Sequence, residues 1–168
     1  MAKKDKLDAI ELLKKDHREV EALFSDFQKT SGEKTKEKIA QKICTELKIH
    51  AIIEEEIFYP AIRGKVDDDD IDEALVEHDG AKVLINEIES SGSKSDFFDA
   101  KVKVLQEEIE HHVKEEEKQW GSLFSQARKT DVDMDALGEQ MAERKAELQE
   151  QARSKGLPPA KMATMEQA

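Results

Sequence analysis

The chain has 168 residues, of which 39% are charged and 38% are apolar, as expected for one compact domain with a short appendage. Ala, Glu, Lys, Leu and Arg account for 80 of the 168 residues, a composition typical of long helices, so a strand-rich fold is disfavoured. The net charge of −12 argues against binding to nucleic acid or to an anionic membrane surface.

The sequence contains neither a secretory apolar segment nor an 18-residue apolar span, because charged residues interrupt every apolar stretch in residues 1–27. Cys44 is the sole cysteine, which allows no disulfide within the chain and fits a reducing compartment. We interpret it as a small buried apolar residue. We therefore expect a soluble, cytoplasmic protein that is a monomer or a weak homo-oligomer and has no nucleic-acid or membrane partner.

Apolar residues recur with a helical period in four segments, at residues 10–27, 39–61, 71–88 and from about 95 to 123. Short breaks that contain Gly, Ser or runs of charge separate these segments. Four helices with short connections favour an all-α fold, an up-down-up-down antiparallel four-helix bundle over residues 1–129.

The pattern weakens beyond Lys129. Met134, Leu137, Met141 and Leu148 are spaced to line one face of a fifth helix, packed outside the bundle or against another subunit. From Gly156 onwards the chain is expected to be frayed. Residues 130–168 are therefore predicted to be a C-terminal helical extension with a disordered tail.

Four of the five histidines lie on the apolar stripes, one near the middle of each helix: His17, His50, His78 and His112. A lone histidine on an apolar face is usually a hydrogen-bonded structural residue. Four that converge at one depth favour a metal or catalytic site instead. His111 and Glu115 fall on the solvent face and form an alternative register.

Two of these histidines have a glutamate one helical turn further on, in the pairs His50–Glu54 and His112–Glu116. The spacing places imidazole and carboxylate on the same face of the helix. A buried carboxylate is costly unless its charge is compensated, and no Lys or Arg lies on the four stripes at that depth. Divalent metal ions would provide the compensation.

The same order of groups occurs twice, because His17 precedes His50 by 33 residues and His78 precedes His112 by 34. Two hairpins related by a pseudo-twofold axis would bring six ligands to one cavity: His17, His50, Glu54, His78, His112 and Glu116. Imidazole and carboxylate suit iron, zinc, copper or manganese. Two metal ions bridged by the glutamates would keep positions for solvent, hydroxide or a diatomic ligand.

The chain resembles the hemerythrin-like, or HHE cation-binding, family over residues 7–127. The resemblance is carried by residues 12–24, 50–60, 77–88 and 111–124, which read LLKKDHREVEALF, HAIIEEEIFYP, EHDGAKVLINEI and HHVKEEEKQWGSLF. It implies a centre of two iron ions (Fe2+/Fe3+) with an oxo or hydroxo bridge, held by the same six residues, with Glu54 and Glu116 between the irons. Zinc and manganese are the alternatives. Such a centre would bind O2, peroxide or NO for oxygen or oxidative-stress sensing, protection or iron handling.

Two features differ from the oxygen-carrying members of that family. Those proteins have a further histidine one turn from the third-helix ligand, where this chain has Ala74 and Lys82 on either side of His78, and their last motif ends in Asp at a longer spacing, where this chain has Glu116. A more open metal ion favours redox turnover over stable oxygen carriage. Glu55, Glu77 and Glu115 are interpreted as solvent-facing, with a role as substitute oxygen ligand as the alternative.

Two other functions remain open from the sequence. One is enzymatic decomposition of peroxide at the same centre with Tyr59 as a redox relay, although Tyr59 is interpreted first as structural. The other is a metal-free helical interaction module in which the histidines form a buried polar network. Trp120, one turn beyond Glu116, is expected to pack beneath the metal ions.

Overall fold

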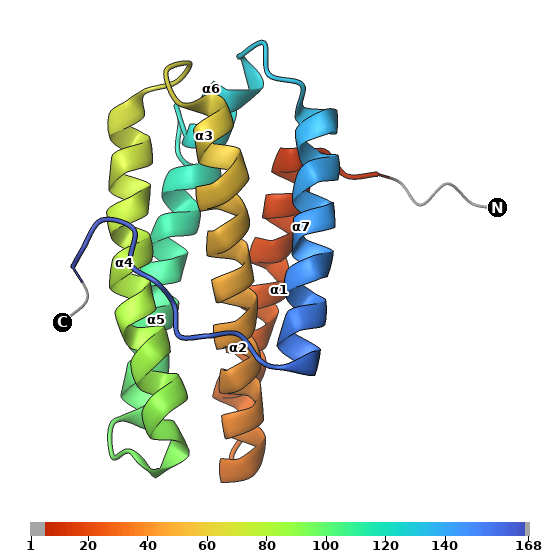
Figure 1. Cartoon of the computed structure of the whole chain (residues 1–168). Coiled ribbons are helices and arrows are strands. Elements are labelled where there is room, and N and C mark those ends of the chain that lie inside the picture. Colours follow the sequence, from red (N-terminus) through yellow and green to blue (C-terminus); the bar gives the residue numbers. More distant parts are fainter. Residues whose placement is uncertain (1–5, 167–168) are drawn as a thin grey trace.

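The computed structural model describes residues 6–166, so the charged start of the chain and the last two residues of the predicted tail lie outside the described part. Four helices lie side by side with roughly parallel axes and form the bundle (Figure 1): α1 (Ala9–Lys29), α2 (Glu33–Ile53), α4 (Asp68–Ser91) and α5 (Phe98–Val113). Their directions alternate, and they pack as the hairpins α1–α2 and α4–α5. The predicted all-α, up-down-up-down bundle is confirmed.

The second helix of each hairpin is followed by a π-helical turn, which is wider than an α-helical turn. α2 continues into a π-helical turn, η1 (Glu54–Phe58), and then into α3 (Tyr59–Ile62), while α5 continues into a second π-helical turn, η3 (Lys114–Lys118). In each turn a backbone N–H bonds to a carbonyl five residues earlier, Tyr59 to Glu54 and Gln119 to Lys114. Single π-helical turns are frequent at functional sites. Both predicted metal-binding carboxylates lie in these turns.

Side-chain caps start the helices where the sequence has acidic residues. Asp8 accepts a hydrogen bond from the Glu11 amide at 2.9 Å, and the Glu11 carboxylate accepts one from the Asp8 amide at 3.0 Å, which together form a capping box on α1. Asp67 caps α4, and the acidic residues of its first turn favour the positive end of the helix. Short connections complete the bundle, η2 (Gly92–Lys94) and α6 (Leu123–Arg128).

A polar layer divides the apolar core into two clusters. On α1, Leu13 belongs to the first cluster and Val20 to the second; on α4, Ile71 and Ala81 are divided in the same way. His17 and His78 lie between these residues on α1 and α4 and belong to the polar layer. Apolar packing on both sides therefore shields the polar layer from water along the bundle axis.

Cys44 lies fully buried in the second cluster, as predicted from its solitary occurrence. Burial, together with the negative charge of Glu89, raises the pKa of its thiol to about 12. We expect Cys44 to resist a thiol reagent such as dithionitrobenzoate at a pH of about 8 in the folded protein and to react fully in guanidinium. Rapid labelling of the native protein would contradict this placement.

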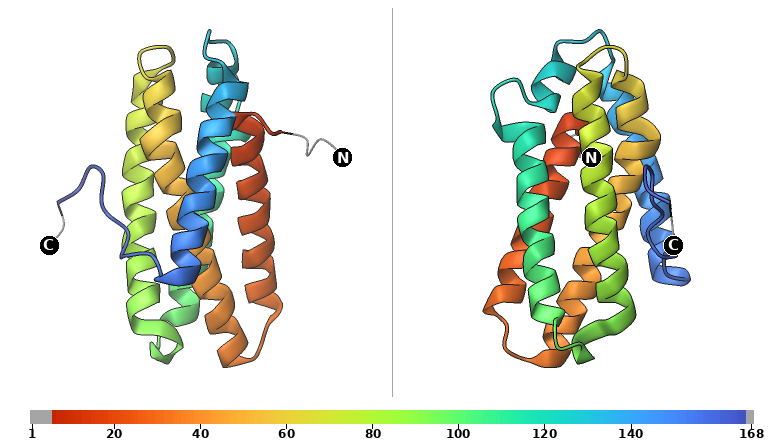
Figure 2. Two further views of the ribbon diagram at one scale, coloured as in Figure 1. Left: turned by 45° about the vertical axis from the view of Figure 1, so that its right-hand side comes forward. Right: turned by 90° about the vertical axis from the view of Figure 1, so that its left-hand side faces the viewer.

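The fifth helix forms as predicted. α7 (Met134–Ser154) packs against α1 and α2 (Figure 2), and its apolar residues Leu137, Met141 and Leu148 join the first core cluster. At Gly138 the helix approaches the chain that leads into α1 so closely that a Cβ would lie 2.6 Å from the carbonyl oxygen of Leu7. α7 is thus part of the core rather than a separate attachment.

The expectation of a frayed tail is not met in residues 157–166, which we call the C-terminal strap. The strap leaves α7, crosses α2 and follows α4 (Figure 1). Lys48 on α2 donates to the carbonyl of Pro158 at 3.1 Å, and Asn86 on α4 exchanges two hydrogen bonds with the backbone of Ala160, at 3.0 and 2.8 Å. Because these contacts involve strap backbone, the side-chain pattern of the strap gives no sign of them.

None of the helices in residues 6–166 combines the length and the apolar character that crossing a bilayer requires.

Candidate metal centre

The six residues predicted as metal ligands lie together in the polar layer. Each of the four bundle helices contributes one histidine, and each π-helical turn contributes one carboxylate. His17 and His78 lie near the middle of α1 and α4, but His50 and His112 lie in the last turn of α2 and α5 rather than near mid-helix as predicted, because the π-helical turns begin there. We call these four the central histidines because they surround the centre. All six side chains are buried: His17, His50, Glu54, His78, His112 and Glu116. The sequence reasoning thus located one cluster of six buried groups.

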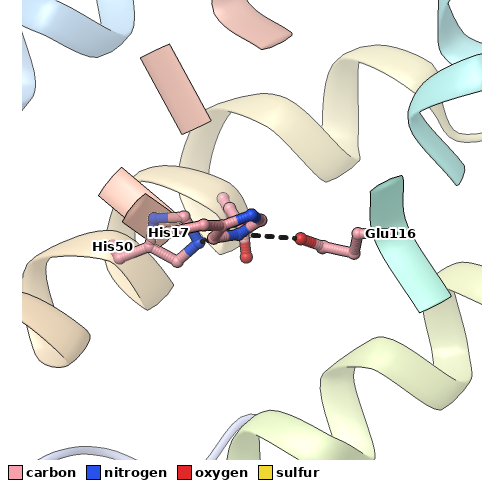
Figure 3. Close-up of side chains that lie close together, drawn as sticks. His17, His50 and Glu116 are labelled. Atoms are coloured by element: carbon pink, nitrogen blue, oxygen red, sulfur yellow. Dashed lines mark hydrogen bonds and ion pairs between the residues drawn. The ribbon is translucent and has the colours of Figure 1, made fainter. Parts of the chain in front are cut away.

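The histidines form one pair in each hairpin. In the first hairpin His17 Nε2 lies 3.1 Å from His50 Nε2, and in the second His78 Nε2 lies 3.2 Å from His112 Nε2. Each hairpin therefore directs two ring nitrogens into one small space. Figure 3 shows the first pair beside Glu116.

Glu54 faces both histidine pairs. Its Oε1 lies 3.0 Å from His50 Nε2, and its Oε2 lies 3.0 Å from His78 Nε2. Oε2 also accepts from the Tyr59 hydroxyl at 2.9 Å, whereas the buried Oε1 accepts no hydrogen bond from the described residues because its contact with His50 lacks hydrogen-bond geometry. One carboxylate oxygen is thus directed to each pair.

Glu116 repeats this arrangement from the other hairpin. Its Oε2 lies 3.3 Å from His17 Nε2, the contact dashed in Figure 3, and its Oε1 lies 3.2 Å from His112 Nε2. The Tyr59 hydroxyl lies 2.5 Å from Oε1, while Oε2 is buried and accepts no hydrogen bond within residues 6–166. Both carboxylates therefore join the two histidine pairs and each has one unsatisfied oxygen.

This donor set fits two divalent metal ions. Four imidazole nitrogens and two buried carboxylates match the ligand preferences of iron, manganese or zinc better than those of calcium or magnesium. Buried carboxylate oxygens without hydrogen-bond partners are rare in folded proteins, and Glu54 Oε1 and Glu116 Oε2 are suited to bind a cation. The residues present thus fit the metal centre expected from the sequence.

In the absence of metal, protons would balance the charge of the layer. Burial alone would lower the pKa of His50, but Glu54 and Asp16 raise it to about 10. Burial and the charge of Glu54 would raise the pKa of Glu116, but His112 and His17 lower it to about 2. An imidazole binds a cation through an unprotonated nitrogen, so metal binding must displace protons from this layer.

The outer nitrogen of every histidine contacts a second carboxylate. The Nδ1 contacts are His17–Glu117 at 3.0 Å, His50–Asp16 at 3.2 Å, His78–Glu55 at 2.9 Å and His112–Glu77 at 2.6 Å. A carboxylate at Nδ1 fixes the ring proton there, so the neutral ring directs its lone pair at Nε2 towards the centre. All four histidines are thereby oriented to bind a cation.

The outer carboxylates make equivalent contacts in the two hairpins. The residue before the first histidine of a hairpin, Asp16 or Glu77, contacts the second histidine of the same hairpin. The residue after the inner carboxylate, Glu55 or Glu117, contacts the first histidine of the other hairpin. The pseudo-twofold relation inferred for the inner groups thus extends to the groups that support them.

A basic side chain contacts each outer carboxylate in turn. Lys145 on α7 pairs with Asp16 and Arg18 pairs with Glu117. Lys82 lies 2.7 Å from Glu55, and His111 Nε2 lies 3.2 Å from Glu77. The fifth helix therefore supports the orientation of one of the four central histidines through Lys145 and Asp16.

The sequence reasoning missed the outer carboxylates, although a signal for them was present. Both hairpins carry an acidic residue directly before the first histidine and a second glutamate directly after the inner one. The sequence favours a solvent-facing position for Glu55 and Glu77, with a substitute oxygen ligand as the alternative, but their side chains are only 19% exposed and contact the outer nitrogens of His78 and His112. His111 and Glu115 do lie on the outer face, as predicted.

Two further expectations are wrong. Trp120 does not pack beneath the centre but is fully exposed, because the helix ends with the π-helical turn and Gln119 is extended, so the helical period stops short of it. Lys48 and Lys82 are buried near the layer, where no cation was expected. They pair with Glu89 and with Glu55 and Asp79 rather than with the inner carboxylates, so the charge of Glu54 and Glu116 still needs compensation.

Tyr59 connects the two inner carboxylates through one hydroxyl group. Burial and the charges of Glu116 and Glu54 raise its pKa well above 10, so the hydroxyl keeps its proton. In the metal-free protein, Tyr59→Phe removes the donor and leaves further buried oxygens unpaired, which we expect to cost about 1–3 kcal/mol of unfolding free energy. Urea unfolding followed by circular dichroism measures this change, and an unaltered midpoint would contradict the role of the hydroxyl.

The fold and the site define a helical bundle protein with a buried His/Glu cation site. The chain belongs to the hemerythrin HHE cation-binding domain family, whose model matches residues 8–124. A crystal structure of a hemerythrin HHE cation binding domain-containing protein from Mycobacterium kansasii is similar in fold, with a TM-score of 0.73 and 22% identity over 90% of this chain and 95% of that one.

A curated relative is a DNA nickase of Nostoc sp. (strain PCC 7120 / SAG 25.82 / UTEX 2576), which is 27% identical over 118 residues. That match spans 70% of this chain but only 33% of the nickase. The chain thus corresponds to about a third of the length of that relative.

Proposed function

We propose that the chain is a non-haem di-iron protein whose centre binds O2, peroxide or NO, in oxygen or oxidative-stress sensing, protection or iron handling. One observation carries the proposal. Glu54 and Glu116 each direct one oxygen to the histidine pair of one hairpin and the other oxygen to the pair of the other hairpin. A carboxylate with that placement suits a bridge between two cations.

The histidine pairs and the two inner carboxylates would hold the ions, one near each pair. Bound iron would supply reversible ligand binding and electron exchange with oxygen species. The chain contributes the rest of the chemistry. Its outer carboxylates fix the ring protons at Nδ1, its two apolar clusters exclude water, and Tyr59 holds a proton at Oη beside both carboxylates.

Anaerobic titration of metal-free protein with ferrous iron tests the proposal. We expect saturation at two ions per chain and, after exposure to O2 or peroxide, a new near-ultraviolet band from an oxygen bridge between ferric ions. His112→Ala should lose the second ion and the band. The neighbouring His111→Ala is the matched control and should keep both, since the His111–Glu77 contact is solvent-exposed and Glu77 still contacts His112 Nδ1 without it. Failure of the wild type to retain iron would refute the proposal.

Decomposition of peroxide is the second candidate, and the position of Tyr59 favours it. A buried tyrosine hydroxyl that contacts both inner carboxylates lies close enough to the centre to act as a redox relay. Oxygen evolution from peroxide by the iron-loaded protein, His78→Ala and Tyr59→Phe separates turnover from binding. Equal rates for wild type and His78→Ala would rule out catalysis at this centre.

A further inference from the structure

A cavity of about 420 Å³ adjoins the candidate metal centre. All four central histidines line it, whereas the inner carboxylates and Tyr59 are not among its lining residues. From the histidines it extends between α2 and α4 to α7 and the C-terminal strap. The cavity thus joins the imidazole side of the centre to the segment that follows the bundle in the sequence.

The wall of this cavity is mainly aliphatic. Val20, Leu47, Ala81 and Ile85 line it from the bundle, and Leu148 lines it from α7. The strap contributes its roof through residues 157–162. Such a wall gains free energy by covering an apolar molecule rather than water.

The volume is far larger than a diatomic molecule or hydrogen peroxide requires. It equals the share of liquid volume of roughly fourteen water molecules, and pockets for organic ligands typically start at about 300 Å³. A centre that acted only on molecules of two heavy atoms would need a narrow passage rather than this space. The size therefore indicates an occupant with an organic body.

The charges of the wall disfavour an anionic occupant. The buried cations that line the cavity are already paired: Lys48 with Glu89, and Lys82 with Glu55 and Asp79. Asp16, Glu55 and Glu56 also line the cavity and pair with Lys145, Lys82 and Arg144. Lys161 lines it too but is exposed, so every buried or half-buried cation of the wall already has an acidic partner and none is left to compensate a buried carboxylate or phosphate. The occupant that fits has a neutral polar end.

The roof of the cavity is built into the fold. The Asp79 carboxylate on α4 is fully buried and accepts backbone hydrogen bonds from Ala163, Thr164 and Met165, at 2.7 to 2.9 Å. Lys82 donates to the carbonyl of Lys161 at 2.8 Å. These bonds hold the strap over the cavity, so the wall is preorganised for a ligand.

We propose that this cavity binds a neutral aliphatic molecule with a hydroxyl or hydroperoxide end, the polar end towards the histidines and the aliphatic body beneath the strap. As a ligand class for the same centre, this rests on the proposed function, because an alkyl hydroperoxide is the peroxide that the cavity fits. Binding itself depends on the wall and not on the metal ions.

Fluorescence of the neutral probe N-phenyl-1-naphthylamine with the metal-free protein tests the proposal. We expect one probe molecule to bind per chain and 1-decanol to displace it at least tenfold more effectively than ionised decanoate. Ala81→Phe fills the cavity from α4 and should weaken probe binding at least tenfold. Val83→Phe adds the same group on the exposed face of α4 and should leave binding unchanged.

Three results would overturn the proposal: no probe binding, equal binding by the Ala81→Phe and Val83→Phe proteins, or displacement by decanoate as effective as by decanol. If Ala81→Phe does not fold by circular dichroism, Leu157→Trp fills the cavity from the strap and takes its place. Iron retention is measured on separate aliquots of the same proteins after they are loaded with ferrous iron. Probe binding without iron retention refutes the proposed function alone, and iron retention without probe binding refutes the cavity ligand alone.

Discussion

Loading the metal-free protein with two ferrous ions per chain is expected to raise its melting temperature by on the order of 10 °C or more. A ligand at 1,000 times its dissociation constant stabilises the folded state by about 4 kcal/mol per site, and each kcal/mol shifts the melting temperature of a domain of this size by about 2–4 °C. The expected gain comes from Glu54 and Glu116, whose unsatisfied oxygens gain partners. Calorimetry with and without a chelator measures it.

Neighbouring histidines provide the control for this experiment. His112→Ala removes an inner group and should abolish most of the metal-dependent shift, while His111→Ala should retain it. A chelator that leaves both helicity and melting temperature of the wild type unchanged would instead favour the metal-free interaction module. In that case protonated imidazoles would be the permanent partners of the two carboxylates.

The positions of the four central histidines and of Glu54 and Glu116 could be predicted because helical periodicity determines on which face of a helix a residue lies and at which level of the bundle. His17 and His78 occupy equivalent positions between apolar residues on α1 and α4, so the stripes alone place them at one level of the bundle. The repeated spacing to a glutamate then identified which carboxylates point inward. Short connections made the antiparallel order of helices the natural choice.

The roles of the outer carboxylates and of Lys82 depend on contacts between helices, and the apolar periodicity of a single helix does not predict such contacts. Asp16 and Glu117 lie at the edge of their stripes, and only the packing of a neighbouring helix brings them to a histidine. Lys82 was missed for the same reason, since its partner Glu55 belongs to another helix. The prediction for Trp120 is wrong because it extends the helical period of α5 beyond Lys118, where the helix ends. No proline or glycine before Trp120 marks that end in the sequence.

The strap illustrates a different limit of sequence patterns. It has no helical or strand period, and its composition is typical of a loose terminus. Its order comes from side chains on the bundle, above all Asp79 and Asn86, that bind its backbone. The information for this segment is thus located more than 70 residues away in the sequence.

Three consecutive glutamates in η1, the π-helical turn that follows α2, allow the largest mutational effect to be measured against two internal references. Glu54 faces the centre, Glu55 supports His78 from behind, and Glu56 pairs with Arg144 at the surface. Glu54→Gln keeps the shape of the side chain but replaces a charged bridge by a neutral amide. We expect it to bind at most one metal ion per chain, with a loss of affinity beyond the roughly 10- to 100-fold change typical of removing an outer partner.

The two neighbouring substitutions set the scale for that loss. In Glu55→Gln the amide oxygen still accepts from His78 Nδ1 and only the charge is lost, so affinity should fall by about tenfold with two ions retained. Glu56→Gln should bind metal like the wild type. Competition with a chromophoric chelator gives affinity and stoichiometry for all three proteins, and circular dichroism establishes that each is folded. Equal losses at positions 54 and 56 would show that Glu54 does not join the two cation sites, because its bridging position between the histidine pairs is what separates it from a surface carboxylate.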